Sequence, residues 1–97
     1  MLVIIGENAV TIVELIKRFK DYSLVKCTLK TGRTHQIRVH MKYVGHPILG
    51  DTLYGGQTSL INRQALHAYK VTFIHPITKQ KTEIISALPN DIKKIIE

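Results

Sequence analysis

Hydrophobic and polar positions alternate in the first part of the chain, and this pattern predicts a β-hairpin. Residues 9–19 are rich in Val, Ile, Thr and Leu, a composition that favours a strand, although the spacing of some apolar positions would also suit a helix. The strand is favoured because a turn-like segment, Lys20–Tyr22, is followed by residues 25–30, in which apolar and polar side chains alternate. An isolated two-stranded ribbon is only marginally stable, so this hairpin needs a further layer over its apolar face.

A helix with two different sides is predicted directly after this hairpin. From Thr34 onward, apolar residues recur at the spacing of one helical face and polar residues form a separate row, and Gly45 stands at the expected end. The apolar row is Ile37, Met41 and Val44, and the polar row is Thr34, Arg38 and Lys42. Residues 46–56 then have the glycine and proline content of an ordered loop, and residues 57–66 give only a weak signal for a helical turn.

A second pair of strands and a short helix are predicted to end the chain. Residues 69–73 alternate between apolar and polar positions, residues 75–80 make the connection, and residues 81–87 return. Pro89 suits a first helical turn, and the apolar positions after it give a short amphipathic helix. The expected fold class is therefore α+β: antiparallel (mixed) β-sheet hairpins, one helix packed on one face, and a short C-terminal helix.

Length and composition bound the class of protein. The 97 residues are enough for one small domain that buries roughly 60–70% of its unfolded surface. No run of ~18 apolar residues and no basic leader occur, so we expect neither a membrane partner nor secretion, and a cytoplasmic location. The single Cys27 cannot form an internal disulfide, and we expect a small strand residue in a reducing compartment.

Basic residues are concentrated in one quarter of the chain. Residues 17–42 contain eight lysines and arginines and one acid, Asp21, and so carry the whole formal excess of +7. Elsewhere six basic residues balance six acidic ones. A surface that faces phosphates requires such one-sided charge, although an ordinary solvated basic face has the same composition.

Arg38 is predicted to need an anionic partner. A guanidinium pairs bidentately with carboxylate or phosphate, and Arg38 lies beside the apolar row of the helix, where a buried cation without a partner would cost several kcal/mol. Within the chain only Asp51 could approach the helix. Because Asp51 stands in a glycine-rich loop, we expect it instead to accept hydrogen bonds from nearby backbone N–H groups of the loop. Arg33, in the loop before the helix, is placed to reach a phosphate.

The five histidines do not have the spacing of a metal site. There is no His-Glu-x-x-His, no cysteine pair and no helical pair of histidines three or four residues apart, so no metal is expected. His40 is expected to be a hydrogen-bonded, partly buried residue, and His35 to contact an RNA phosphate or sugar. His67 and His75 are expected to be structural. Paired carboxylates for acid and base catalysis and a serine nucleophile are also missing from the pattern.

Four blocks in this order and spacing resemble the RluA-type pseudouridine synthases. The resemblance extends from about Ala9 to Ile95, and a linked series of this kind is far more specific than any single motif. The blocks are Thr31-Gly32-Arg33-Thr34-His35-Gln36-Ile37-Arg38-Val39-His40; Gly45-His46-Pro47-Ile48; Gly50-Asp51 with Tyr54-Gly55; and Arg63-Gln64-Ala65-Leu66-His67-Ala68 before Phe73-Ile74-His75-Pro76.

The resemblance implies an isomerase that converts uridine to pseudouridine in ribosomal or transfer RNA without metal or cofactor. In the family an aspartate attacks a nucleotide flipped from its stack, and the uracil is rejoined through carbon 5. Arg38 matches the arginine that forms an ion pair with that aspartate, and Leu66 matches a leucine that packs near the flipped base. The residues expected to scaffold the site and contact RNA are Arg33, His35 and Gln36, together with Lys30 and Lys42.

One departure from the family pattern concerns the nucleophile. The family's aspartate lies upstream in a His-Arg-Leu-Asp block followed by Thr-Ser-Gly, and no such block occurs here; nor does any tyrosine stand in the context of the one that stacks on the target base. We therefore expect residues 1–97 to be the C-terminal portion of the catalytic domain, from an internal start, a truncated gene or a boundary set for expression. We expect this chain to be inactive alone, and to self-associate or pair with the missing N-terminal half.

Two other interpretations remain open. The chain could be a non-catalytic RNA-binding module that uses the basic stretch from Lys17 to Lys42, or a basic fragment with only structural meaning.

Overall fold

The computed structural model describes residues 1–6 and 8–97, with the backbone alone at Phe73. The chain divides into two compact units, residues 1–64 and residues 65–97, which we call the first and second units. Both combine antiparallel strands with one short helix, so the predicted α+β class is confirmed. Within the described residues, no helix has the length and apolar character needed to cross a membrane.

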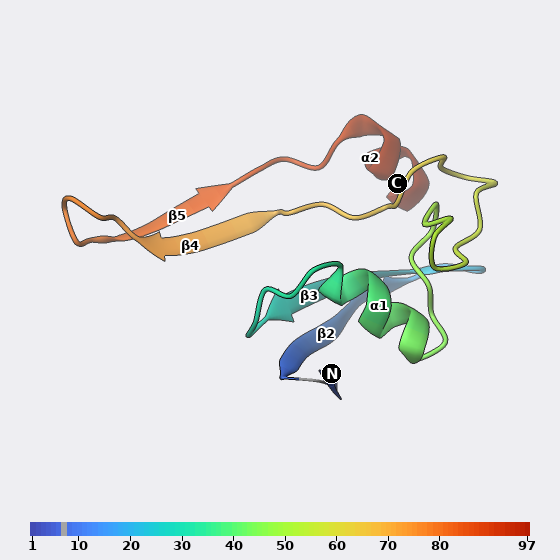
Figure 1. Ribbon diagram of the computed structural model, residues 1–97. Coiled ribbons are helices and arrows are strands. Elements are labelled where there is room, and N and C mark those ends of the chain that lie inside the picture. Colours follow the sequence, from blue (N-terminus) through green and yellow to red (C-terminus); the bar gives the residue numbers. More distant parts are fainter. Residues whose placement is uncertain (7) are drawn as a thin grey trace. The chain divides into compact units, whose positions relative to one another are not determined.

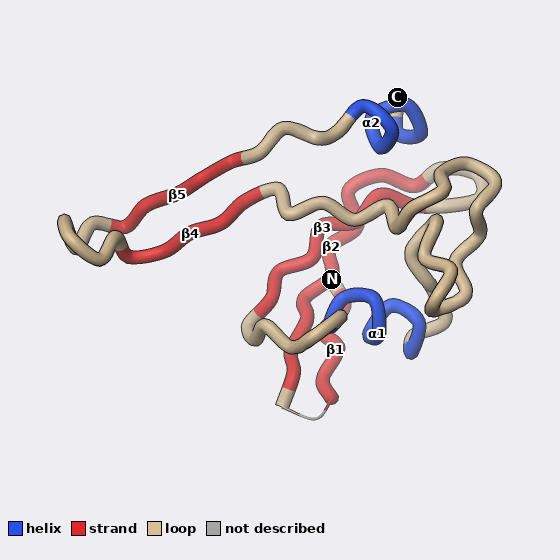
Figure 2. The backbone as a smooth tube through the Cα atoms, turned by 45° about the horizontal axis from the view of Figure 1, so that its top comes forward, coloured by secondary structure: helices blue, strands red, loops and turns tan. Residues whose placement is uncertain are grey.

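The first unit is built on a three-stranded antiparallel sheet in the order β1-β2-β3 (Figures 1 and 2). The strands are β1 (Leu2–Gly6), β2 (Ala9–Arg18) and β3 (Ser23–Leu29). The predicted hairpin of β2 and β3 is confirmed. Strand β1 was not predicted; it pairs along its whole length with β2, and its signal in the sequence is the apolar run before Gly6. A third strand supplies the extra support that a lone hairpin lacks.

Helix α1 (Gln36–Tyr43) covers one face of this sheet. Ile4 from β1, Val13 from β2 and Met41 from α1 form the buried core. Packed against them are the partly buried residues Val25, Cys27, Ile37, Val44 and Ile48. The predicted apolar row of the helix is therefore the row that faces the core. Burial raises the pKa of the Cys27 thiol, so Cys27 is a packed strand residue rather than a reactive thiolate.

The helix ends where the sequence predicted. Gly45 has a φ of 84°, and its N–H donates to the Lys42 carbonyl at 2.9 Å, while the N–H of His46 donates to the Met41 carbonyl at 2.8 Å. This is the hydrogen-bond pattern of a Schellman C-cap, in which glycine adopts the left-handed conformation most easily. The start is two residues later than expected, at Gln36 rather than Thr34.

The segment after the helix is an ordered loop, as predicted. Gly50 donates its N–H to the Gln57 carbonyl and Gly56 donates to the Asp51 carbonyl, each at 2.7 Å. A Cβ at Gly50 would overlap the carbonyl of Arg63, so this loop closes on itself too tightly for a side chain there. The weak helical signal in residues 57–66 does not become a helix; the segment is irregular, with Ile61 buried.

The second unit is a hairpin followed by a helix, as predicted. Its elements are β4 (Lys70–Ile74), β5 (Lys81–Ile85) and α2 (Asn90–Ile96). β4 and β5 pair with each other in a separate two-stranded sheet. Pro89 takes the N-cap position rather than the first helical turn, because its backbone is extended. The side chain of Phe73, at an apolar position of the predicted strand, lies outside the described residues.

Two histidines of the second unit have structural roles, as expected. His67 Nε2 lies 2.9 Å from the carbonyl oxygen of Ser86, which ties the segment before β4 to the segment after β5. His75 Nδ1 accepts the backbone N–H groups of Ile77 and Thr78 at 3.1 and 3.3 Å, and so closes the turn between the strands.

Candidate active site

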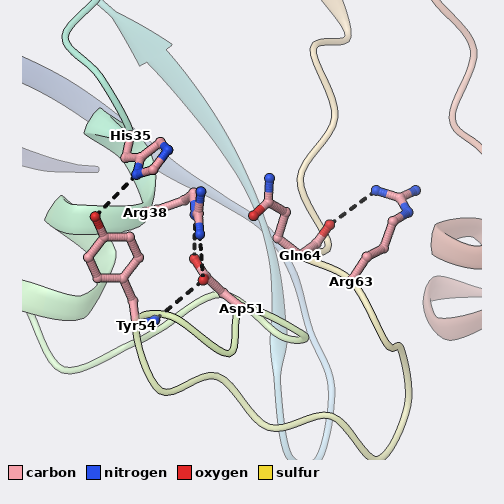
Figure 3. A network of polar contacts seen from close by, with 6 residues as sticks. All are labelled: His35, Arg38, Asp51, Tyr54, Arg63 and Gln64. Carbon is pink, nitrogen blue, oxygen red and sulfur yellow. Dashed lines mark hydrogen bonds and ion pairs between the residues drawn. The ribbon is translucent and has the colours of Figure 1, made fainter.

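Arg38 and Asp51 form a bidentate ion pair at the centre of the first unit's polar network (Figure 3). Arg38 Nε donates to Asp51 Oδ2 at 2.8 Å and Arg38 Nη2 donates to Oδ1 at 3.0 Å. The carboxylate side chain is 1% exposed and the guanidinium side chain 14%. The prediction that Arg38 needs a carboxylate is confirmed. Asp51 supplies this carboxylate because the loop after the helix brings it back to α1, and its expected role as an acceptor for loop amides is also present.

The loop holds Asp51 in place from several sides. Its N–H donates to the Ile48 carbonyl at 3.1 Å, and its Oδ1 also accepts the N–H of Tyr54 at 3.4 Å. The hydrogen bond from Arg38 lowers the pKa of the Asp51 carboxyl below its ordinary value of 3.8, against burial, which acts in the opposite direction. The same hydrogen bond raises the pKa of Arg38. Both groups therefore stay charged at neutral pH.

Tyr54 covers the guanidinium and links it to His35. The centre of its ring lies 5.1 Å from Arg38 Cζ, a cation–π contact, and its hydroxyl lies 3.2 Å from His35 Nδ1. The two rings meet edge to face, with centroids 6.0 Å apart. Figure 3 shows Arg38 between the Asp51 carboxylate and these two rings. Tyr54 was not predicted as a site residue, although it lies three residues after Asp51 within a motif block.

His35 adopts a backbone conformation that is uncommon for residues other than glycine. Its φ of 52° and ψ of 26° place it in the left-handed region, at the N-cap of α1. Its carbonyl accepts the N–H of Val39 at 2.9 Å, so the residue turns the chain into the helix while its ring remains exposed beside Tyr54. Such strain in a non-glycine residue often marks a functional site.

Gln36 scaffolds the site, which is one of the two roles expected of it. Its side chain is 4% exposed and both ends of the amide are fully used. Nε2 donates to the Val10 carbonyl and to Thr11 Oγ1, each at 2.9 Å. Oε1 accepts from Thr31 Oγ1 at 2.8 Å and from the Arg33 N–H at 3.0 Å. With two donors and two acceptor positions engaged, the amide has nothing left for a ligand.

His40 is buried and hydrogen-bonded, as predicted. Its Nδ1 lies 2.7 Å from Thr11 Oγ1, and Thr11 is completely buried. Because Thr11 also accepts from Gln36, one strand hydroxyl fixes two residues of the motif helix. The functional motif is therefore attached to β2 by its polar groups as well as by the apolar core.

The other predicted RNA-contacting residues are exposed; three precede α1 and one lies in its last turn. Lys30 follows the end of β3, Arg33 and His35 precede the helix, and Lys42 lies one turn after Arg38. Leu66 is half-buried and belongs to the second unit, so the structure does not place it at this site.

The arrangement presents a fixed cation with unused donors. A guanidinium has five N–H donors, and Asp51 takes two of them through the Nε–Nη2 edge. Within residues 1–6 and 8–97 no other hydrogen bond to this guanidinium occurs, so the Nη1 group and one Nη2 hydrogen are left for a second anion. Among the described residues, no group of three or more His, Cys, Asp and Glu side chains is arranged to hold a metal ion. The chemistry at hand is electrostatic: positioning and stabilisation of an anion.

Comparison with known proteins points to one family. Residues 3–43 match the family model described as RNA pseudouridylate synthase. The RNA pseudouridine synthase YlyB of Bacillus subtilis, described as uncharacterized, is 50% identical over 93 residues, which are 95% of this chain and 31% of the relative. The ribosomal large subunit pseudouridine synthase D of Blochmanniella floridana is 42% identical over 107 residues, covering 94% of this chain and 33% of the relative. The chain belongs to the RluA-type RNA pseudouridine synthase family.

The resemblance drawn from the motifs is thereby confirmed. The chain spans about a third of the length of these pseudouridine synthases. The residues matched by the family model run from β1 through α1 and so contain Arg33, His35 and Arg38, whereas Asp51 and Tyr54 lie beyond them. Those two residues lie within the motif block Gly50-Asp51 with Tyr54-Gly55, so the sequence signal for them was a glycine-flanked acid shortly after the helix.

Proposed function

We propose that this chain is the C-terminal portion of a pseudouridine synthase catalytic domain, which isomerises uridine to pseudouridine in RNA. The observation that carries the proposal is Arg38, held by Asp51 on one edge with its other N–H donors unused. A relative named as a ribosomal large subunit synthase supports ribosomal RNA as the substrate, which would place the reaction in the cytoplasm.

In this proposal Arg38 binds the carboxylate of the nucleophilic aspartate through its free N–H groups. An opposite charge at this distance keeps a carboxylate ionised, and a bidentate contact also fixes its orientation for attack on the flipped nucleotide. Asp51 and Tyr54 restrain the guanidinium, so it need not reorganise when the nucleophile arrives. Arg33, His35, Lys30 and Lys42 contact the RNA, and Leu66 packs near the flipped base.

A chimera tests the catalytic role of Arg38. Residues 1–97 replace the matching segment of the Blochmanniella floridana synthase D, which supplies the rest of the domain. The chimera should form pseudouridine in ribosomal RNA, and Arg38→Ala should abolish turnover while RNA binding stays within a few-fold. Lys93→Ala, an exposed change in α2, is the control and should leave turnover unchanged. Turnover that survives Arg38→Ala would contradict the proposal.

The isolated chain gives a second test. We expect no pseudouridine in RNA treated with residues 1–97 alone, because the family's aspartate block is missing from this sequence. Detection of the isomer by mass spectrometry of digested RNA would show that another group acts as the nucleophile.

A non-catalytic RNA-binding module is the second candidate, and the observation that favours it is the charge of residues 17–42, which carry the whole excess of +7. It predicts an affinity that falls steeply with salt and depends on several lysines more than on Arg38. A chimera with normal RNA binding and no turnover, even with Arg38 intact, would favour this candidate.

We also propose that a second copy of the chain or the missing N-terminal half covers the sheet face opposite α1. Val3 and Ile5 lie on that face at 51% and 72% exposure. β1 and β3 are both edges of the described sheet, and apolar faces and open edges promote association.

A further inference from the structure

The turn of the β2–β3 hairpin carries three exposed cations in four residues. Lys17 and Arg18 are the last residues of β2, and Lys20 lies in the turn. Among the described residues these three side chains form no ion pair, whereas Lys70 Nζ lies 3.3 Å from Glu83. Lys26, further along β3, lies opposite Glu14 in the strand register. Residues 17–22 contain one acid, Asp21. This end of the hairpin is therefore strongly positive without internal compensation.

An aromatic pair makes this cationic turn ordered. The rings of Phe19 and Tyr22 stack with centroids 5.0 Å apart, and the Phe19 N–H donates to the Tyr22 carbonyl at 2.9 Å. Lys17 Nζ lies 5.1 Å from the centre of the Phe19 ring. Because the turn is closed and Lys17 rests on a ring, these charges lose less conformational freedom on binding than lysines on a mobile loop.

A β-bulge directs the cations to both sides of the sheet. The register of β2 and β3 shifts between Leu15 and Lys17, so Ile16 has no partner of its own. Leu15 is opposite Val25 and Lys17 is opposite Leu24, and side chains at successive positions of a strand point to opposite faces. The extra residue therefore places Lys17 and Arg18 on the faces opposite to those of a regular strand. Bulges that re-aim side chains in this way are common near functional sites.

The cationic turn is distant from the candidate active site. β3, with seven residues, separates it from the segment that enters α1, and Figures 1 and 2 both show the turn and that segment at opposite ends of the strand. At ~3.3 Å per residue the separation is about 23 Å. A B-form strand advances ~3.4 Å per nucleotide and would need on the order of seven nucleotides to cover this distance. The A-form helix of RNA rises less per nucleotide and needs slightly more.

We propose that this turn is a second RNA-contacting site, in which Lys17, Arg18 and Lys20 bind phosphates of a helical segment some seven nucleotides from the target uridine. The inference rests on the proposed function, since the partner is the RNA substrate of that site. Phosphate contacts fix the position and orientation of a nucleic acid without reading its sequence. The turn and the basic residues before α1 thus act as two points that align a structured RNA along β3.

Binding of two RNA hairpins to the 97-residue chain tests this site. One RNA has a stem of about four base pairs, too short to reach both points, and the other a stem of about twelve. We expect the long stem to bind more tightly and with a steeper salt dependence. Lys17→Ala/Arg18→Ala/Lys20→Ala should weaken binding of the long stem on the order of tenfold at low salt, lower its salt slope by about two to three, and leave the short stem nearly unchanged.

Matched variants separate this site from a general loss of charge. Lys81→Ala/Lys93→Ala/Lys94→Ala removes an equal number of positive charges, three, from the second unit and should keep the preference for the long stem. Lys17→Arg/Lys20→Arg keeps the positive charge of the turn. This variant should bind both RNA hairpins like the unaltered chain, which would show that substitution in the turn does not by itself disturb the fold. Equal affinities for the two stems, or equal losses in the two alanine triples, would overturn the second site alone. Failure of the unaltered chain to bind either RNA would overturn the proposed function with it.

Discussion

The two units differ in how their few elements are held together. The first unit has a buried apolar cluster of Ile4, Val13 and Met41, with a fully buried hydroxyl, Thr11, beside it. In the second unit, Ile92 alone is buried among the apolar side chains that the structure describes there. Its strands expose Val71, Ile74, Ile84 and Ile85 at 50% or more.

The difference explains where the candidate site can be built. Arg38 and Asp51 keep a 2.8 Å contact because the helix and the loop that carry them are fixed by packing, a C-cap and close glycine contacts. A hairpin with mostly exposed side chains has no comparable means to fix a charged group. The site belongs to the first unit, whereas the second unit consists mainly of exposed side chains.

Met41→Ala should produce the largest loss of stability. A buried methionine cut to alanine leaves a cavity and costs about 2–5 kcal/mol, which chemical denaturation followed by circular dichroism would measure. Ile84→Ala in the second unit, 55% exposed, is the control and should change the unfolding free energy by less than ~0.5 kcal/mol. Similar losses in both variants would mean that the second unit has a core of equal importance.

Asp51→Asn should lower the melting temperature at pH 7 by on the order of 10 °C, because Arg38 loses its charged partner. The pKa of Asp51 is lowered by folding, so its stabilisation is complete above the ordinary value of 3.8 and is lost as pH falls toward the folded value. The difference in melting temperature between the unaltered chain and Asp51→Asn should therefore become smaller below about pH 4. Thermal melts from pH 7 to pH 2 measure it, and a gap that is constant with pH would show that the carboxylate charge does not matter.

Thr11→Val should cost roughly 1–3 kcal/mol, somewhat less than the core cavity. Valine has nearly the same shape, but the change leaves Gln36 Nε2 and His40 Nδ1 without their buried partner. Thr28→Val is a matched control, since Thr28 is half-buried and its hydroxyl forms no hydrogen bond among the described residues. If the two variants unfold at the same denaturant concentration, the polar network does not contribute to the first unit.

Ile5→Lys should leave stability within ~0.5 kcal/mol and change association instead. Ile5 lies on the uncovered sheet face, and a lysine there opposes contact with a second copy. Sedimentation at micromolar concentration should show self-association of the unaltered chain and its loss in this variant. Ile77→Lys, at an 84% exposed position in the second unit, should associate like the unaltered chain. A compact monomer before any substitution would contradict self-association through this face and leave the N-terminal half of the catalytic domain as its proposed cover.

Local sequence patterns determined much of the architecture. Periodicity and turn residues predict four features: the hairpin of β2 and β3, the apolar and polar sides of α1, its end at Gly45, and the second hairpin. These features depend on residues that are close together in the sequence. The strand β1 was missed because a five-residue apolar run could belong to several elements. The family was evident because four motif blocks stand in one order, and the charge of residues 17–42 is a property of sequence alone.

Tertiary structure decided which polar groups meet. Asp51 reaches Arg38, and Gln36 turns inward to Thr11, because a C-cap, a tight loop and a sheet register bring together residues that are 13 and 25 positions apart. Periodicity places a side chain on a face but does not specify the partner on another element. The sequence therefore predicted that Arg38 needs an anion, and only the fold showed that Asp51 supplies one and leaves donors free for another.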